Sequence, residues 1–370
     1  MKLKVLQENL NEALLIASRF TSSKSQLPVL ANLLISAKKN KITISSTNLE
    51  ISSAVSMGAK IDEDGETTVP SRVLTEIITN LKPGTVSLTS EKEHLNIVSE
   101  SFNSVISGLN PSDFPSIPQS LSEPKVDVDS RILTDCLSQV LFAVSSDETR
   151  PVLTGVLVIF KKSEIEFVST DGFRLSKKGI QANAGNLGSE KLIIPKNALS
   201  ELLRLLSGED NVGFSFKTQE NLVVFGVGNT ILSSRVIEGE FPDFEKIIPK
   251  DFKIRVNLDK EEFERAVKLA SVFAKDSANV VKINVKADSL ELSAESSQSG
   301  RQASVVDAKI EGLEKEFTIA FNYRFLEEYL KSVKGESVKF ELSDANSPGV
   351  FLDPKDKDYL HLIMPVKLQS

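Results

Sequence analysis

Side chains that could perform chemistry are few in this chain and lie far apart. Its 370 residues include one cysteine, Cys136, and two histidines, His94 and His361, and neither histidine has a Cys, Asp or Glu at the spacing of metal ligands. A zinc site needs at least three such protein ligands. Nucleophilic catalysis needs a base and an orienting group beside the nucleophile, and no set of Ser, His and Asp stands out. We therefore predict no metal site and no covalent catalysis.

Short motifs that could suggest a nucleotide-binding enzyme or a hydrolase are weak. The GVG at 226–228 lacks the third glycine and the strand-to-helix setting of a dinucleotide fingerprint, and no GxxxxGK[ST] loop occurs. Asp171 beside Gly172 is more typical of a turn between strands than of acid catalysis. We therefore predict that the chain is not an enzyme and takes no cofactor, which favours a binding protein.

The composition is that of a globular protein that stays in the cytoplasm. Hydrophobic residues make up 40% of the chain, and polar residues interrupt the amino-terminal segment where a signal peptide would be continuously apolar. No apolar run approaches the length of about 18 residues that a membrane span needs. The single cysteine excludes an intramolecular disulfide and is typical of a reducing compartment. The length allows two or three domains.

Internal repeats indicate how the chain is organised. The segment LPVLANLLISAKK begins at Leu27, and RPVLTGVLVIFKK begins at Arg150; each combines a proline turn, an apolar run and a Lys-Lys hairpin before a second strand. A fainter third copy, ANVVKINVKADSLELS, begins at Ala278. The related segments SGLNPSDFPSIP at 107–118 and EGEFPDFEKIIP at 238–249 close the first and second copies. A repeat with this period predicts three similar domains.

Amphipathic helices repeat in step with the strands. Apolar residues at i, i+3, i+4 and i+7 mark the face of a helix that packs on a core. The ranges predicted to be helical are 8–19, 71–82, 129–143, 196–207, 259–275 and 324–334. One set of apolar quartets is Leu10, Ala13, Leu14, Ala17; Leu133, Cys136, Leu137, Val140; and Phe263, Ala266, Val267, Ala270. The other set is Leu74, Ile77, Ile78, Leu81; Leu199, Leu202, Leu203, Leu206; and Leu326, Tyr329, Leu330, Val333.

These patterns predict an α+β fold of three tandem domains, each with two helices packed on antiparallel sheets. Proline-containing joins at 115–127 and 248–254 place the domains at 1–119, 125–247 and 253–370. Tandem domains related by a constant rotation form an arc, and an arc can close with a symmetric partner. Such an arc could equally stay open and extend, whereas closure by two copies that meet head to tail would give a ring of six domains.

The charge distribution agrees with a helical side that meets phosphate. The net charge of −7, taken alone, argues against nucleic acid, because phosphate binding needs Lys and Arg. Within the predicted helices, however, basic and acidic residues nearly balance, so the excess of acid lies elsewhere in the chain. Charges that only solvate exposed helix faces would give the same pattern, and both interpretations stay open on this feature. Loose phosphate contacts, independent of sequence, would suit a sliding ring.

The chain resembles the bacterial DNA polymerase III beta subunit family, the sliding clamps, over its whole length. The motifs that carry the resemblance are LPVLANLL at 27–34, TDGFRLS at 170–176, GEFPDFEKIIP at 239–249 and MPVKL at 364–368. The resemblance implies a head-to-tail homodimeric ring around duplex DNA, with helices lining the hole. It also implies that the ring confers processivity by tethering the DNA polymerase III alpha subunit, and that it binds the clamp loader and other proteins with a clamp-binding motif.

The resemblance further implies a peptide-binding pocket between the second and third domains. Apolar side chains such as Leu175, Ile247 and Met364 would line it, and methionine suits a surface that accepts several partners. Arg174 would hold a peptide backbone or carboxyl group. For any one of the apolar residues, viewed without the resemblance, core packing is the better interpretation. The implied pocket residues are Leu153, Thr170, Gly172, Phe173, Arg174, Leu175, Pro242, Lys246, Ile247, Asn322, Phe325, Met364, Pro365, Val366 and Leu368.

The resemblance also points to residues for DNA binding and for ring closure. A solvated surface cation is an equal alternative for each DNA-binding residue, and core packing is an alternative for Phe273. The DNA-binding residues are Lys24, Arg72, Arg150 and Lys196. The dimer-interface residues are Val105 and Ile106 in the first domain and Val272 and Phe273 in the third.

A tandem-repeat scaffold that binds proteins but never DNA would share every fold prediction. Retention on circular DNA after loader action, lost when the circle is linearised, would separate a clamp from such a scaffold.

Overall fold

The computed structural model describes residues 1–22, 25–123, 125–182, 190–208, 210–217 and 220–367. By their contacts the residues form two compact units. Unit 1 combines 1–131 with 201–236, and unit 2 combines 132–200 with 237–370. The middle third of the sequence therefore contributes to both units. The domain limits at 119, 125, 247 and 253 stay a prediction.

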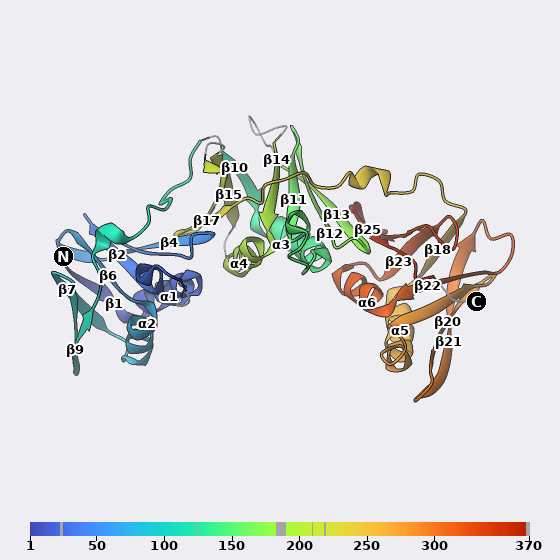
Figure 1. Ribbon diagram of the computed structural model, residues 1–370, viewed down its shortest axis with the longest axis horizontal. Helices are drawn as coiled ribbons and strands as arrows, with labels where there is room; N and C mark the ends of the chain where they lie inside the picture. The colour runs from blue at the N-terminus through green and yellow to red at the C-terminus, as the bar shows by residue number, and fades with distance from the viewer. Residues whose placement is uncertain (23–24, 124, 183–189, 209, 218–219, 368–370) are drawn as a thin grey trace. The chain divides into compact units, whose positions relative to one another are not determined.

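The predicted helices are present among the described residues (Figure 1). The quartets predicted from the apolar spacing are buried, except that Ile77, Leu81 and Leu203 are half-buried. The amphipathic pattern is therefore confirmed as a guide to which helix faces pack on a core. No helix among the described residues is long and apolar enough to cross a lipid bilayer. The helices are α1 (Gln7–Ala17), α2 (Ser71–Asn80), α3 (Ser130–Val140), α4 (Lys196–Leu205), α5 (Lys260–Ala274) and α6 (Tyr323–Ser332).

Local sequence explains where several helices begin. Asp259 caps α5, because its side chain accepts a hydrogen bond from the Glu262 N–H (2.9 Å). Asn322 caps α6 in the same way, with the Arg324 N–H as donor (3.0 Å). Pro70 stands directly before α2 with φ of −55°, close to the value that the proline ring imposes.

Unit 1 contains two antiparallel sheets. The smaller sheet has the order β5 (Lys60–Glu63), β1 (Lys2–Leu6), β7 (Thr85–Glu91), β8 (His94–Ser99) and β9 (Phe102–Ser107). The larger sheet has the order β10 (Lys125–Asp129), β15 (Asn211–Lys217), β16 (Leu222–Val227), β17 (Thr230–Arg235), β4 (Ile51–Gly58), β3 (Lys41–Thr47), β2 (Asn32–Lys38) and β6 (Gly65–Pro70). Helices α1 and α2 pack together, and their apolar faces share one core with strands of both sheets.

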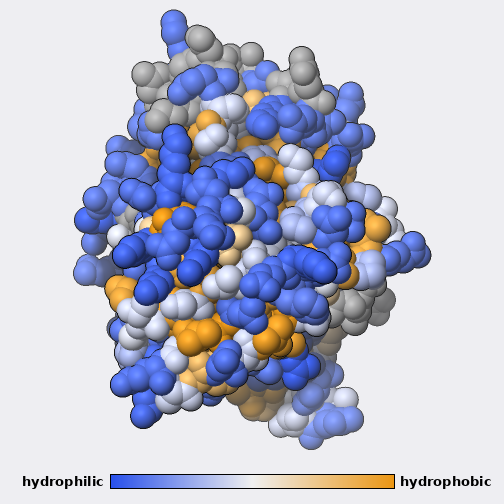
Figure 2. All heavy atoms as spheres, turned by 90° about the vertical axis from the view of Figure 1, so that its left-hand side faces the viewer, coloured by the Kyte–Doolittle hydropathy of each residue, from blue (hydrophilic) through white to orange (hydrophobic). Residues whose placement is uncertain are grey.

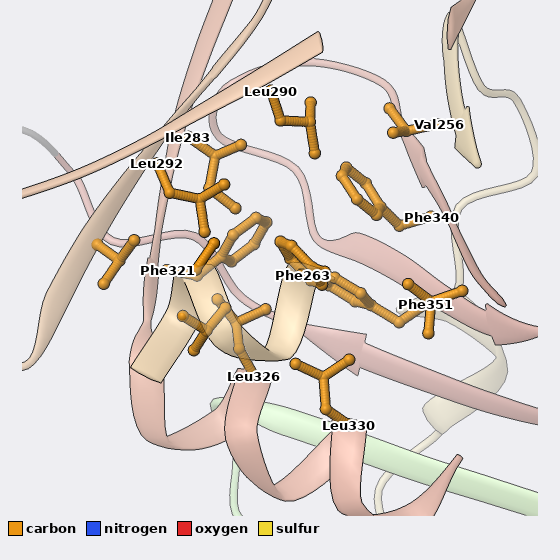
Figure 3. Packing of buried hydrophobic residues seen from close by; sticks show 14 of the residues in the cluster. Val256, Phe263, Ile283, Leu290, Leu292, Phe321, Leu326, Leu330, Phe340 and Phe351 are labelled. Carbon is orange, nitrogen blue, oxygen red and sulfur yellow. The ribbon is translucent and has the colours of Figure 1, made fainter. Parts of the chain in front are cut away.

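Unit 2 is built on a single sheet of twelve strands. Its first six strands are β14 (Lys191–Pro195), β11 (Gly155–Phe160), β12 (Glu164–Thr170), β13 (Arg174–Gln181), β25 (Asp356–Ile363) and β24 (Gly349–Asp353). The other six are β23 (Ser337–Leu342), β18 (Ile254–Asp259), β21 (Gly300–Glu311), β20 (Ser289–Ser296), β19 (Val280–Val285) and β22 (Phe317–Asn322). Figure 3 shows Phe263 of α5 and Leu326 of α6 meeting Phe321 and Phe351 from the strands in the main core of this unit.

Both long sheets join strands from neighbouring thirds of the sequence. In unit 1, β17 pairs antiparallel with β4, and Thr230 lies opposite Val55. In unit 2, β13 pairs antiparallel with β25, and Ser176 lies opposite His361. β4 and β13 each follow the hairpin of their own repeat, while β17 and β25 each end the next repeat. The two joints are therefore copies of one pairing.

Candidate functional site

The turn at 170–174, between β12 and β13, is held by its own side chains. Thr170 Oγ1 accepts the Gly172 N–H (3.1 Å) and donates to the Arg174 carbonyl (2.6 Å). Asp171 Oδ1 accepts the N–H groups of Phe173 (2.9 Å) and Arg174 (3.0 Å). Gly172 has φ of +92°, a left-handed conformation that glycine adopts without strain. This geometry leaves Phe173 at the surface, 62% exposed.

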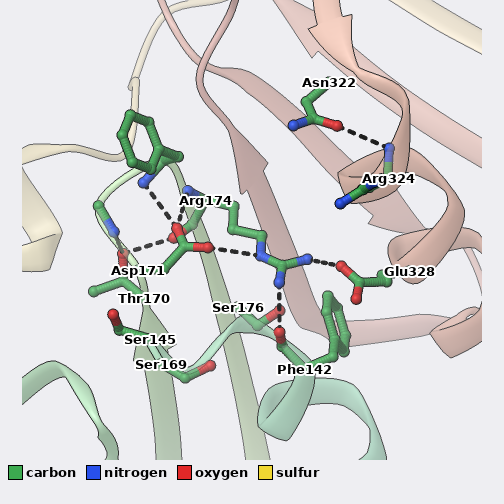
Figure 4. A network of polar contacts seen from close by, with 12 residues as sticks. Phe142, Ser145, Ser169, Thr170, Asp171, Arg174, Ser176, Asn322, Arg324 and Glu328 are labelled. Atoms are coloured by element: carbon green, nitrogen blue, oxygen red, sulfur yellow. Dashed lines mark hydrogen bonds and ion pairs between the residues drawn. The ribbon is translucent and has the colours of Figure 1, made fainter. Parts of the chain in front are cut away.

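Arg174 runs from this turn into the interior, where it is only 8% exposed. Its Nε donates to Asp171 Oδ2 (3.1 Å), and its Nη2 donates to the Phe142 carbonyl (2.6 Å). Its Nη1 donates to the carboxylate of Glu328 on α6 (Figure 4). The Phe325 ring centroid lies 4.5 Å from Arg174 Cζ, within the range of a cation–π contact. Two carboxylates therefore already balance the charge of Arg174.

The segment that follows β25 closes on the same turn. The Met364 N–H donates to the Phe173 carbonyl (2.8 Å), and the Val366 N–H donates to the Ala320 carbonyl of β22 (2.8 Å). Asn322 lies at the end of β22 and caps α6. The structure thus brings together the predicted turn, the start of α6 and the carboxy-terminal segment, which are far apart in the sequence.

Exposure divides the predicted pocket residues into an outer and an inner group. Phe173, Ile247 and Met364 expose large apolar surfaces. Leu153 and Leu175 are buried, and Leu175 belongs to a hydrophobic cluster on the sheet. Core packing therefore accounts for the inner leucines, whereas the outer three residues can bury surface against a ligand. The remaining predicted residues are Thr170, Gly172, Arg174, Pro242, Lys246, Asn322, Phe325, Pro365, Val366 and Leu368, the last of which lies outside the described residues.

The GEFPDFEKIIP segment is anchored through one aromatic residue. Phe244 is buried and packs in the same cluster as Leu175 and Leu362. Lys246 is exposed and pairs with Asp243 (2.8 Å). The hydrogen bond between them raises the pKa of Lys246 and lowers the pKa of Asp243. The lysine therefore reaches any ligand with its charge partly offset.

A buried polar cluster joins β13 to β25 near Arg174. His361 Nδ1 lies 2.6 Å from Ser176 Oγ, and Ser332 Oγ lies 2.6 Å from Tyr359 Oη. His361 is fully buried, and burial, followed by the charge of Arg174, lowers the pKa of His361 well below its usual range. The imidazole is therefore neutral in the folded chain at neutral pH.

The cations predicted to contact DNA differ in their exposure and in whether they already form ion pairs. Arg72 on α2 is exposed and forms an ion pair with Glu76 one turn later (3.0 Å). Arg150 forms an ion pair within its own loop (3.2 Å) and reaches the turn described above. Lys196 is the first residue of α4 and is half-buried. Lys24 lies outside the described residues.

The four predicted dimer residues alternate between surface and core. Val105 on β9 is 61% exposed, whereas Ile106 is buried in the core of unit 1. Val272 on α5 is 57% exposed, whereas Phe273 packs against the core of unit 2. β9 is an edge strand of its sheet. Figure 2 faces the side of the molecule where β7 and β9 lie, and hydrophobic side chains reach the surface there between hydrophilic ones.

A second apolar surface, on α5 and β21, was not predicted from the sequence. Val305 is 62% exposed, and Leu269 is also exposed. Along β21, residues 300–307 pair with β20 and residues 308–311 pair with β18, so the described pairing leaves one edge open beside Val305. In the third repeat, β21 occupies the position that β4 and β13 occupy in the first and second repeats. Comparing the three repeats would therefore have pointed to β21. The groove here is lined by Glu262, Arg265, Ala266, Leu269, Ser304, Val305, Val306 and Asp307.

Cys136 lies in the interior of the chain. Burial raises the pKa of the Cys136 thiol, so the sulfur stays protonated and unreactive. Within the described part of the chain, no group of three or more His, Cys, Asp and Glu side chains is placed to hold a metal ion.

Comparisons with known proteins agree over the whole chain. The family models that match are the DNA polymerase III beta subunit N-terminal domain at residues 1–118, its central domain at 127–243 and its C-terminal domain at 245–367. The beta sliding clamp of Staphylococcus epidermidis is 30% identical over 359 residues, which is 94% of each chain. That of Staphylococcus aureus is 29% identical over 358 residues, again 94% of each.

Solved structures give the same result. The DNA polymerase sliding clamp of Bacillus subtilis matches with a TM-score of 0.94 and 27% identity, and the alignment covers 100% of both chains. The C. crescentus beta sliding clamp matches with a TM-score of 0.93 and 28% identity, also over 100% of both chains. With its three domains matched in order, the chain belongs to the DNA polymerase III beta subunit family.

Proposed function

We propose that this chain functions as a DNA sliding clamp through three surfaces, one for peptides, one for ring closure and one for DNA. As a DNA polymerase III beta subunit, the chain is a processivity factor rather than an enzyme, and it acts as a homodimeric ring on DNA. The observation that carries this function is the match of all three family domains in their order along the chain. We also propose a cytoplasmic location, where a bacterial polymerase meets its DNA.

The first surface is the peptide site around Phe173, Ile247 and Met364. Partly exposed apolar side chains beside a rigid turn form a surface on which a short peptide can bury large side chains. The adaptable thioether of Met364 suits several partner sequences. We propose that the DNA polymerase III alpha subunit, the clamp loader and other proteins with a clamp-binding motif dock here.

The second surface closes the ring. The joints β4–β17 and β13–β25 are two copies of one antiparallel pairing. Continuing the repeat, the open edge of β21 in one copy would pair with the edge strand β9 of the next copy. Val305 and Val105, both exposed, would then lie at this third joint together with Val272. Two copies that meet in this way at both ends give a closed head-to-tail dimer.

The third surface is the helical one, which we propose meets the phosphates of duplex DNA. Several of its cations are already paired on their own helix, such as Arg72 with Glu76 and Arg265 with Glu261. Paired cations neutralise few phosphates, so binding should depend weakly on salt and not at all on base sequence. Retention would then come from ring closure rather than from a tight electrostatic grip.

Retention on DNA of different topology tests this function. The dimer would be loaded onto primed circular DNA by the clamp loader, and bound protein would be measured after gel filtration before and after cutting the circle once. We expect the protein to stay on the circle and to leave the linear form within the time of the column. A protein that stays on linear DNA with free ends, or that never loads, contradicts the proposal and would favour a scaffold that does not encircle DNA.

A further inference from the structure

We propose that Glu328 sets the charge selectivity of the peptide site by neutralising Arg174, so that the site prefers an uncharged peptide segment to an acidic one. Glu328 acts through Arg174 as a positioning residue. The inference rests on the proposed peptide-binding function of this surface and adds to it the class of peptide that the surface accepts.

The guanidinium of Arg174 is the charge at the centre of this network, and carboxylates already match it. An arginine stays protonated at any relevant pH, so it carries a full positive charge. Asp171 and Glu328 each supply a carboxylate within contact distance of it. The three groups together have a net negative charge. An acidic side chain brought to Arg174 would therefore meet repulsion rather than a free cation. Arg150, which also reaches this turn, is paired with Asp147.

The two carboxylates have different roles in the structure. Asp171 also accepts the N–H groups of Phe173 and Arg174, so removing it would disturb the turn itself. Glu328 has a side chain that is 42% exposed, and it projects from α6, which Asn322 caps. Figure 4 shows it approaching the guanidinium from the opposite side to Asp171. Glu328 is thus the residue whose charge can change while the turn stays intact.

Loss of the Glu328 charge leaves a buried cation with one carboxylate partner. Arg174 is 8% exposed and lies against the rings of Phe325 and Phe142, so water compensates a missing partner poorly. A peptide carboxylate would then recover the lost interaction. We therefore expect the relative affinity for acidic and uncharged peptides to change. A distortion of the site alone would weaken both kinds of peptide and would not change this preference.

The test uses the full-length protein and pairs of short fluorescent peptides rich in Leu and Phe. Within each pair the peptides differ by Glu or Gln at one position, and this position is moved along the sequence. Dissociation constants are measured by fluorescence anisotropy for the wild type, Glu328→Gln and Glu327→Gln. Glu327 is the matched control, because it is the neighbouring glutamate of α6 and acts on Arg324, as Glu328 also does, while the carboxylates paired with Arg174 are those of Asp171 and Glu328.

We expect the wild type to bind the Gln peptide more tightly at the position nearest Arg174. In Glu328→Gln the ratio of the two constants should shift toward the Glu peptide by about fivefold, the size expected for one partly screened charge. Glu327→Gln should keep the wild-type ratio. Glu328→Asp, which keeps the charge, should also keep most of the wild-type preference.

Three results would overturn the inference while leaving peptide binding established. They are an unchanged ratio in Glu328→Gln, an equal weakening of both peptides, or the same shift in Glu327→Gln. If the wild type binds none of the peptides, the proposed peptide site itself fails. If thermal unfolding shows that Glu328→Gln does not fold, Glu328→Asp takes its place. This variant keeps the charge, so a fivefold shift of its ratio of dissociation constants toward the Glu peptide contradicts the inference.

Discussion

Phe173 and Leu175 are two residues apart in the TDGFRLS motif, yet the structure assigns them opposite roles. Phe173 is 62% exposed, whereas Leu175 is 2% exposed and packs in a hydrophobic cluster. Replacing Phe173 by Ala should weaken peptide binding and leave folding stability unchanged. Replacing Leu175 by Ala should lower folding stability first. The pair therefore separates a binding residue from a core residue.

The magnitude follows from the exposed fraction. Full burial of a phenylalanine side chain is worth about 1.5–3 kcal/mol. Because 62% of Phe173 is exposed in the free chain, a peptide that covers it gains about 1–2 kcal/mol, or roughly 5- to 30-fold in the dissociation constant. Leu175→Ala removes buried methyl groups and leaves a cavity, which costs about 2–4 kcal/mol of unfolding free energy.

The assay combines anisotropy with a fluorescent peptide and chemical denaturation of each variant. Gel filtration with light scattering checks that both variants keep the dimer, because neither residue lies on β9, β21 or α5. The reasoning is refuted if Phe173→Ala binds peptide like the wild type. It is also refuted if Leu175→Ala unfolds at the same denaturant concentration as the wild type.

Two further predictions concern the dimer and pH. Val272→Asp or Val305→Asp should give monomers in light scattering at micromolar concentration, because each places a charge on an exposed apolar surface of unit 2; a persistent dimer would move the interface elsewhere. The pKa of His361 is lowered in the folded chain, so the unfolded chain takes up the proton first as pH falls. The free energy of unfolding should therefore fall below about pH 6.5, by at most about 1.4 kcal/mol per pH unit. His361→Gln should reduce this dependence of unfolding free energy on pH, measured by denaturation between pH 7.5 and 5.5. His94 is exposed on β8 and is the control, so a similar reduction in His94→Gln would contradict the assignment of the effect to His361.

Much of the fold could be predicted because the spacing of apolar residues along the chain indicates which side chains are buried. The quartets beginning at Leu10 and Phe263 mark the buried faces of α1 and α5, since residues on one side of a helix recur with its period. The TDGFR turn could likewise be expected, because Gly172 and Asp171 suit a left-handed position and its capping hydrogen bonds. These features depend on neighbours in the chain.

Features that depend on residues far apart in the chain could not be predicted in this way. Arg174 and Glu328 are separated by 154 positions, and no local pattern indicates that they form an ion pair. The resemblance alone would have left Arg174 free to bind a carboxyl group, whereas the fold surrounds it with acceptors. Val105 and Ile106 are equally apolar neighbours on β9 and point to opposite faces of the sheet, but packing decides which of the two faces the core covers.

Local patterns along the chain suffice to predict the helices, the strands and the threefold repeat, and the motifs suffice to predict the family. Each of these depends on periodicity and turn chemistry, which act over a few residues. The tertiary structure decided which of the predicted site residues reach the surface, which cations are already paired, and which strand edges stay open. These properties arise only when the chain closes long loops and brings distant side chains into contact, so their physical origin lies in packing and in electrostatics between distant segments rather than in local preference.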